Sequence, residues 1–414
     1  MNQRERYLRA AVACAIGLAC AASSPLEAVG KQKPIAQIVR PGQSIQSAID
    51  NAPPGGWIYI LPGVYHETAN ATNGLNISAS VNLVGLSTPS APVVLENAGN
   101  QANGVVVVPQ DRTECMSCHA SLAPPFSLLP GVSATPVPRP PMMNEVSIRG
   151  ITIRSFNNNG LFLENVDGFS IVDVQSVDNK NYGIFPTLSR NGVVSNSHAS
   201  GSGDTGIWVE TSSNVLVTGN LVENNVVGFE VSNSDNIFLE GNESRNNSVG
   251  MGIFLLSGLF ASHPGASAVT ATKNSIHDNN RANDAPPNTI LGFLPPGTGV
   301  LVLGVDSSLL SNNDVENNNL AGIAIVDVCL AFAGSSFDCS TDPKATDAYL
   351  ADQDATNDRV VRNKLVHNGT APGPTPFAFA AGDLTLLSTG AGNCFGKNSY
   401  ATSFSIEGFL PACP

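Results

Sequence analysis

The chain has 414 residues, a formal net charge of −13 and 13% charged side chains. Such an acidic chain is an improbable partner for nucleic acid or anionic membrane surfaces, which would repel it. The 39 glycines, 28 prolines and abundant asparagines favour an all-β repeat protein over a helical or disordered one.

Residues 1–21 have the features of a secretory signal peptide, since three arginines precede a small apolar stretch and small residues for cleavage. The apolar stretch is shorter than the ~20 residues that a membrane span needs. The sequence therefore predicts a periplasmic or extracellular protein without a membrane span, with its domain over residues 35–414.

Two short elements open this domain. Ser44 is placed to cap a helix that presents Ile45, Ala48 and Ile49 on one face. Residues 57–65, WIYILPGVY, then predict a strand, a Pro-Gly turn and a further strand. We expect these elements to cap a repeat structure.

A regular repeat occupies residues 146–327. Glycines followed by a short apolar strand recur at Gly160, Gly183, Gly206, Gly228, Gly252, Gly299 and Gly322. This spacing is typical of a solenoid whose coils bury their apolar faces on one another. Alternation directs the first and third residues after each glycine into the core.

Polar residues form a second ladder, in which stacked side chains can bond the turn backbone and one another. We interpret this ladder as structural; its members are Asp173, Asn196, Asn220, Asn242, Asn274, Asn313 and Asn363.

The opening helix and its PG-x-Y segment resemble the pectin-lyase-like superfamily. From residue 146 to 322, segments such as VSIRGITIRSFNNNG and GTGVLVLG resemble exported bacterial β-helix proteins with a paired 22-residue repeat. The resemblance implies an all-β, right-handed, single-stranded parallel β-helix in the bacterial envelope. Members of that family are often associated with c-type cytochromes, but the resemblance implies no reaction.

Four insertions interrupt the repeat. Residues 111–145, 256–268 and 329–358 follow the post-glycine strand and are predicted to occupy one corner, whereas residues 281–297 fall at another turn. Long loops grouped on one edge of a rigid scaffold often carry binding sites. They could equally be tolerated surface insertions.

The first insertion contains a C-x-x-C-H motif, formed by Cys115, Cys118 and His119. This pattern is typical of covalent c-type haem attachment, with the histidine as iron ligand. Met142 or Met143 could supply a thioether as the sixth ligand. Two alternatives stay open, a disulfide between the two cysteines or part of a zinc site.

An aromatic stripe is predicted on the outer face of the post-glycine strands, at Phe162, Phe185, Trp208 and Phe254. Stacked aromatics flanked by carboxylates could hold a polysaccharide. Alternatively, neighbouring insertions fold over the stripe and bury it, since bare apolar stripes are rare on soluble proteins. We favour this second interpretation.

The same face carries candidate catalytic residues. Glu210 and Glu230 are expected ~8 Å apart, within the carboxyl separation of inverting glycosidases. Nearby in the sequence, Asp204 is a third catalytic candidate, and Tyr182 and Arg190 are further ligand-binding candidates beside the aromatic stripe. The residue sets of polygalacturonases, pectin methylesterases and pectate lyases are not recognisable, so the sequence leaves open whether the protein is an enzyme.

The remaining cysteines suggest two C-terminal disulfides, Cys329 with Cys339 and Cys394 with Cys413, as expected in an oxidising compartment. The histidines outside the motif lack metal-ligand spacing.

Three hypotheses follow. The first is a haem-bearing binding or electron-transfer accessory of an exported c-type cytochrome. The second is a polysaccharide-binding or polysaccharide-cleaving protein, and the third is a structural envelope protein without a ligand.

Overall fold

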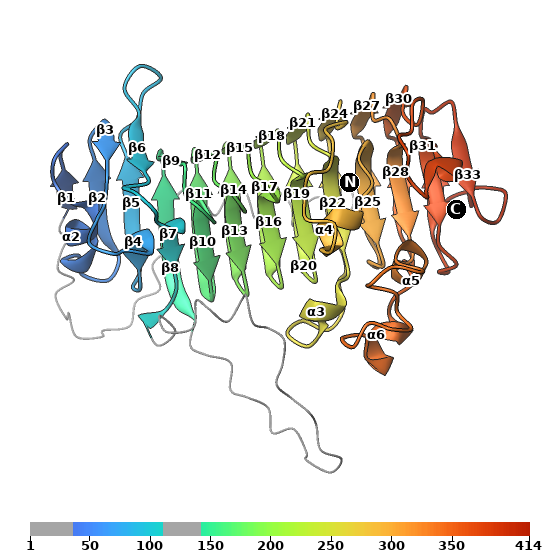
Figure 1. Cartoon of the computed structure of the whole chain (residues 1–414), viewed down its shortest axis with the longest axis horizontal. Helices are drawn as coiled ribbons and strands as arrows, with labels where there is room; N and C mark the ends of the chain where they lie inside the picture. Colours follow the sequence, from blue (N-terminus) through green and yellow to red (C-terminus); the bar gives the residue numbers. More distant parts are fainter. Residues whose placement is uncertain (1–35, 111–141) are drawn as a thin grey trace, which may run out of the picture. The chain divides into compact units, whose positions relative to one another are not determined.

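The computed structural model describes residues 36–110 and 142–414, which build three long parallel sheets (Figure 1). Each coil adds one strand to each sheet in turn. The first sheet contains β1 (Ala36–Val39), β2 (Gly56–Ile60), β5 (Val81–Gly85), β8 (Met143–Arg149), β11 (Val166–Val172), β14 (Arg190–Ser195), β17 (Ser213–Thr218), β20 (Asp235–Glu240), β23 (Thr270–Thr272), β26 (Leu309–Ser311), β29 (Arg359–Val361) and β32 (Cys394–Gly396).

The second sheet contains β3 (Gly63–Tyr65), β6 (Val93–Glu96), β9 (Thr152–Arg154), β12 (Gln175–Val177), β15 (His198–Ser200), β18 (Leu221–Glu223), β21 (Glu243–Arg245), β24 (Ser275–His277), β27 (Asp314–Glu316) and β30 (Lys364–Val366). The third sheet contains β4 (Asn73–Ile77), β7 (Asn103–Val107), β10 (Leu161–Glu164), β13 (Ile184–Thr187), β16 (Thr205–Glu210), β19 (Val227–Ser232), β22 (Val249–Phe254), β25 (Thr298–Leu303), β28 (Ala321–Val326), β31 (Gly382–Leu387) and β33 (Ser403–Ser405).

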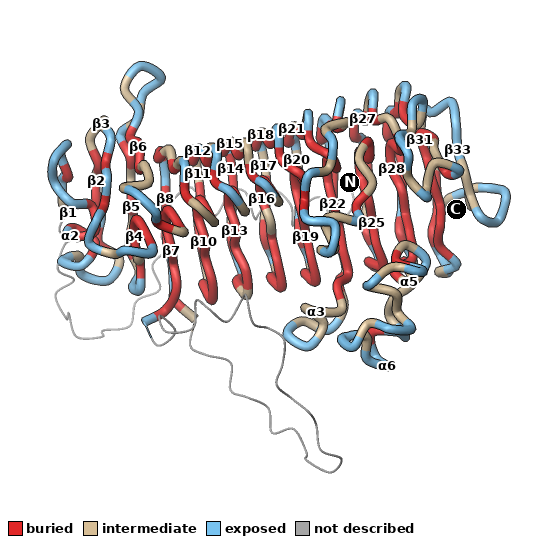
Figure 2. The backbone as a smooth tube through the Cα atoms, in the orientation of Figure 1, coloured by how far each residue is buried: buried red, intermediate tan, exposed pale blue. Residues whose placement is uncertain are grey.

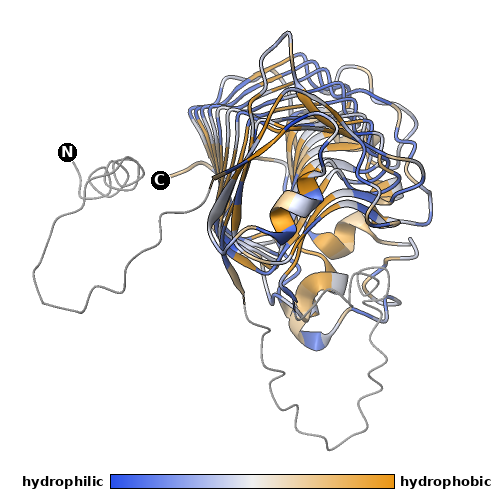
Figure 3. Ribbon diagram, turned by 90° about the vertical axis from the view of Figure 1, so that its left-hand side faces the viewer, coloured by the Kyte–Doolittle hydropathy of each residue, from blue (hydrophilic) through white to orange (hydrophobic). Residues whose placement is uncertain are grey.

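The strands of successive coils pair in register, so that equivalent residues stack. Leu161, Ile184, Ile207 and Phe229 face one another along the third sheet and are all buried. Successive coils superpose when seen along the stack (Figure 3). Burying each such aliphatic side chain stabilises the fold by roughly 1.5–3 kcal/mol. The prediction of an all-β parallel β-helix is confirmed.

The first coils are capped as the sequence predicts. Helix α2 (Ile45–Asp50) begins at Ser44, whose hydroxyl accepts a hydrogen bond from the Ser47 amide at 3.0 Å. Its buried face includes Ile45, Ala48 and Ile49. The helix therefore covers apolar residues at one end of the solenoid that would otherwise face solvent.

The glycine that follows Gly228 in the repeat is Gly250, so the prediction of Gly252 at this position is wrong. Phe229 pairs with Met251 and Glu230 pairs with Gly252, which places Gly250 beside Gly228. Close approach selects glycine here, since a Cβ on Gly228 would lie 2.5 Å from the Gly250 oxygen. The short V-G-M-G-I stretch offers two glycines, and only the pairing identifies the equivalent one.

The asparagine ladder exists but begins later than predicted. Asn220 donates from Nδ2 to Asn242 Oδ1 at 3.0 Å, and the same bond repeats coil after coil to Asn398. Asp173 and Asn196 lie one residue before the ladder, with φ of 54° and 49°. Ser197 takes the ladder position instead, because its amide donates to Asn220 Oδ1 at 2.9 Å.

A second buried ladder was missed by the sequence analysis. It joins carboxamides at a different corner, with Nδ2 to Oδ1 distances of 2.9 to 3.2 Å, through Asn225, Asn247, Asn279, Asn318 and Asn368. The paired asparagines in segments such as LVENN contain these residues. Each amide bonds both neighbouring coils, so the ladders fix their register.

The insertions lie at the predicted corners. Residues 256–268 and 329–358 connect the third sheet to the first; the former contain α3 (Ser257–Phe260), and the latter contain α6 (Asp347–Ala351) and all but the first residue of α5 (Val328–Ala331). Residues 281–297, with α4 (Ile290–Phe293), connect the second sheet to the third. The first insertion ends earlier than predicted, because β8 begins at Met143.

A further loop before β31, not anticipated, contains the 3-10 helix η3 (Ala378–Ala380). Two disulfides are present, Cys329–Cys339 in the 329–358 insertion and Cys394–Cys413 at the C-terminal end, which are the pairs that the sequence suggested. Each closes a short loop of the last coils.

Candidate functional site

A groove of about 780 Å³ lies on the outer face of the third sheet. Its floor is formed by β10, β13 and β16, whose residues are mostly buried (Figure 2). Its walls come from the insertions, through residues 256–259, Ile290 and residues 336–344. The insertions therefore turn one face of a regular scaffold into a concave site.

Aromatic side chains form the floor of this groove. The Phe185 and Trp208 rings stack with centroids 4.4 Å apart and planes 5° from parallel, as residues on adjacent coils. Tyr182 packs against both rings at 4.8 Å, tilted by 58°. Because the stacked rings cover each other's faces, the accessible aromatic surface comes from Tyr182 and Trp208, which are half-buried, while Phe162 and Phe185 are buried.

A hydrogen-bond chain holds Trp208 in place. The indole Nε1 donates to Ser232 Oγ at 3.1 Å, and this hydroxyl donates to Glu230 Oε1 at 2.7 Å. Thr205 Oγ1 donates to the other oxygen, Oε2, at 2.8 Å. Fixing the indole in this way preorganises it for a ligand, since its rotamer need not be ordered on binding.

Acidic side chains lie beside the aromatic floor, since Glu230 pairs in register with Trp208 on the adjacent coil and Asp204 directly precedes β16. Burial raises the pKa of Glu230 to about 7, with the nearby Glu210 charge acting in the same direction. Burial also raises the pKa of Asp204 well above its ordinary range, and the Glu230 charge adds to this effect. The Tyr182 hydroxyl has a raised pKa for the same reason, burial first and these carboxylates second. These groups therefore keep their protons to a higher pH than exposed groups of the same kind.

Glu210 lines the groove itself and accepts a hydrogen bond from Thr187. It pairs in register with Ser232, two residues beyond Glu230. This is the diagonal relation that the sequence predicted for the two glutamates. Glu230 is buried and is not among the groove-lining residues, so the pair does not present two carboxyls to one ligand.

Amide side chains form one side of the groove, and the sequence analysis did not select them. Asn158, Asn159 and Asn181 are among its lining residues. Asn159 is only 7% exposed, and within the described part of the chain its buried carboxamide oxygen has no hydrogen-bond partner. A buried acceptor of this kind favours a donor from a bound molecule. The run of three asparagines at 157–159 was the available signal.

Two predicted ligand-binding residues lie elsewhere. Phe254 pairs in register with Ser232, which pairs with Glu210, so it does not stack in line with Trp208. Its side chain is buried, with the ring lying over Gly252. The mistaken repeat glycine caused this error. Arg190 is exposed on β14 of the first sheet and forms an ion pair with Asp167 at 2.6 Å, so it does not line the groove.

The motif residues Cys115, Cys118 and His119 lie outside the described residues. Of the two methionines suggested as haem ligands, Met143 is buried in the hydrophobic core at the start of β8, whereas Met142 is half-buried beside it. Met142 is therefore better placed to reach a group outside the core.

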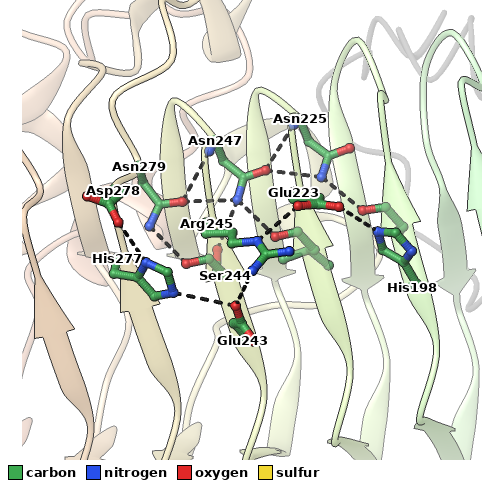
Figure 4. Close-up of polar contacts among 12 residues, drawn as sticks. His198, Glu223, Asn225, Glu243, Ser244, Arg245, Asn247, His277, Asp278 and Asn279 are labelled. Atoms are coloured by element: carbon green, nitrogen blue, oxygen red, sulfur yellow. Dashed lines mark hydrogen bonds and ion pairs between the residues drawn. The ribbon is translucent and has the colours of Figure 1, made fainter.

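The outer face of the second sheet carries a charged ladder (Figure 4). Glu223 bonds His198 at 3.2 Å and Arg245 at 2.9 Å, and Arg245 continues to Glu243 at 2.9 Å. These pairs are partly exposed and mutually satisfied, which is typical of a solvated sheet face. Among the described residues, no group of three or more histidines, cysteines or acids is arranged to hold a metal ion.

Comparison with known proteins identifies the fold. Residues 143–263 match the family model for a right handed beta helix region. The A-modules of the mannuronan C-5 epimerases AlgE4 and AlgE6 of Azotobacter vinelandii each share 15% identity with the chain, with TM-scores of 0.55 and 0.53. Both alignments cover 89% of this chain, and 92% and 94% of the respective modules.

ORF18 of Geobacillus virus E2 gives a TM-score of 0.52 at 13% identity, over 88% of this chain and 63% of that one. No curated protein sequence matches the chain. The protein therefore has the right-handed parallel β-helix fold that the resemblance implied. At these identities the likeness establishes the fold and leaves the activity to the site. In the described ranges, every helix is too short or too polar to cross a bilayer.

Proposed function

We propose that the protein binds a polysaccharide in the groove over β10, β13 and β16. The observation that carries the proposal is the pairing of half-buried Tyr182 and Trp208 with an edge of amides that includes the unpartnered Asn159 oxygen. Aromatic surface and amide groups together match the two faces of a sugar, its C–H face and its hydroxyl edge. Binding is favoured over cleavage, because Glu230 is buried and does not line the groove, so that two carboxyls do not face one ligand.

Tryptophan fluorescence provides a direct test. The chain has two tryptophans, Trp57 and Trp208. Trp57 is exposed on β2, stacked on Tyr59 and outside the groove, so Trp57→Phe leaves Trp208 as the reporter. We expect a saturable change in Trp208 emission with a glycan from a polysaccharide panel. Trp208→Ala should abolish binding measured by calorimetry, while Trp57→Phe should retain it.

Covalent haem attachment is our second candidate function, and the motif of Cys115, Cys118 and His119 supports it. Met142 is half-buried whereas Met143 is buried in the core, so Met142 is the methionine that would supply a thioether ligand if haem were bound. The group would supply one-electron transfer, with an exported c-type cytochrome as the partner class. Protein from a haem-maturing host should show a Soret band that Cys115→Ala/Cys118→Ala removes; an unmodified intact mass would exclude this candidate.

Both candidates place the protein in the periplasm or outside the cell, after removal of residues 1–21. The disulfides Cys329–Cys339 and Cys394–Cys413 support an oxidising compartment. If neither glycan nor haem binds, a structural envelope role would account for the solenoid.

A further inference from the structure

We infer that the groove selects an uncharged glycan and rejects polyuronates. This inference rests on the proposed function, since it names the class of polysaccharide for the same groove. It follows from the charges and hydrogen-bonding groups that surround the aromatic floor.

The ionisable side chains around the groove are mostly acidic. Glu210 and Asp342 line it, and Lys344 is the one cation among the described lining residues. The charge argument rests on these lining residues, because the raised pKa of Glu230 and of Asp204 favours their neutral forms. A polyuronate carries a carboxylate on every sugar and would need several cationic partners, preferably arginines, which bind carboxylates in a bidentate manner.

The rest of the chain does not compensate for this acidity. The whole sequence has a formal net charge of −13. Residues 111–141 contain two acidic residues and two arginines, so that stretch leaves the charge count unchanged. An anionic chain approaching the groove is therefore repelled both locally and by the overall field of the protein.

Uncharged hydroxyl groups match the remaining polar surface. Asn158, Asn159 and Asn181 each offer a carboxamide that can both donate and accept, as a sugar hydroxyl does. The buried Asn159 oxygen lacks a donor, which a hydroxyl of either an uncharged sugar or a uronate could supply, so the discrimination comes from the charges that line the groove.

The test is a fluorescence titration of the Trp57→Phe protein with hexasaccharides of three classes. Cello-, xylo- and manno-hexasaccharides are uncharged, galacturonate and mannuronate hexamers are anionic, and a chitosan hexamer is cationic. We expect at least one uncharged hexasaccharide to bind about tenfold more tightly than either uronate. Its affinity should change less than about twofold between low and high salt, because no ion pairs form.

Charge variants sharpen the test. Asp342→Lys should raise the affinity for the uronate hexamers several-fold. In the native protein the Ser257 hydroxyl donates to the Asp342 carboxylate. Asp342→Asn keeps an acceptor for that hydroxyl and should give an intermediate rise in affinity. Glu407→Lys changes the net charge equally at an exposed position outside the groove and should have little effect.

The outcomes separate the two proposals. Preferential binding of a uronate or of the chitosan hexamer would overturn the charge inference while leaving glycan binding in the groove intact. Equal effects of Asp342→Lys and Glu407→Lys would also overturn it. If no hexasaccharide changes Trp208 emission or gives heat of binding, the proposed function itself fails.

Discussion

The buried acid Asp358 predicts an unusual dependence of stability on pH. Its side chain is fully buried, one carboxyl oxygen has no hydrogen-bond partner in the described structure, and burial raises its pKa to about 8. On the neighbouring coil the stacked residue is the uncharged Asn393, whose side-chain oxygen accepts a hydrogen bond from the Asp358 amide. We expect Asp358→Asn to stabilise the protein, and increasingly so as the pH rises.

The sign and size follow from linkage. In the unfolded chain an aspartate titrates near pH ~3.9, so below that pH the carboxyl is protonated in both states and has no effect. As the pH rises toward about 8, the unfolded chain releases the proton while the folded chain retains it, and stability is lost. Between pH 5 and pH 8 the loss is about 4 kcal/mol, from about 1.4 kcal/mol per pH unit.

Urea unfolding at pH 5 and pH 8 measures this difference, under conditions that keep the disulfides oxidised. The gain from Asp358→Asn should be larger at pH 8 by an amount approaching the calculated loss. Asp327→Asn is the matched control, because that buried carboxylate accepts bonds from the Ala355 amide at 3.0 Å and the Thr389 amide at 2.8 Å. It should destabilise at both values of pH. An equal gain for Asp358→Asn at the two values would refute the reasoning.

Three further changes test the scaffold. A Cβ on Gly228 would meet backbone at 2.5 Å, so Gly228→Ala should lower the free energy of unfolding by about 1–3 kcal/mol, whereas Gly373→Ala meets nothing within 4 Å and should be neutral in urea melts. Asn242→Ala breaks bonds to both adjacent coils and should cost about 2–3 kcal/mol, measured in the same way. Cys394→Ala/Cys413→Ala opens a link of sequence separation 19, which should cost about 3 kcal/mol and expose the C-terminal end to limited proteolysis.

The repeat could be predicted because a solenoid is built from local periodicity. Glycine spacing and alternating aliphatics such as Ile184 and Ile207 specify the strand, its inward face and its stacking partner within one period. The error at Gly252 shows the limit of this approach. Two glycines two residues apart keep the same inward face, so alternation cannot distinguish them, and the hydrogen-bonded register decides.

The candidate site was predicted only in part, for a related reason. Trp208, Phe185 and Tyr182 belong to the repeat and were identified from it. The groove walls come from insertions that lie more than 40 residues after the floor strands in sequence, and no repeat period relates them to the floor. Lys344 and Gly258, for example, belong to different insertions and meet only in the folded protein. Asn159 was overlooked, because asparagine is common in this chain and its unpartnered oxygen is a property of the packed structure.

The sequence by itself thus determined the β-helix, its coil length, its capped start and the corners where insertions leave it, since each depends on residues close together in the chain. Tertiary structure decided which glycine is equivalent, which aromatics are covered, and which acids share an environment. Those properties depend on contacts between coils and insertions, where burial and neighbouring charge act through space rather than along the sequence.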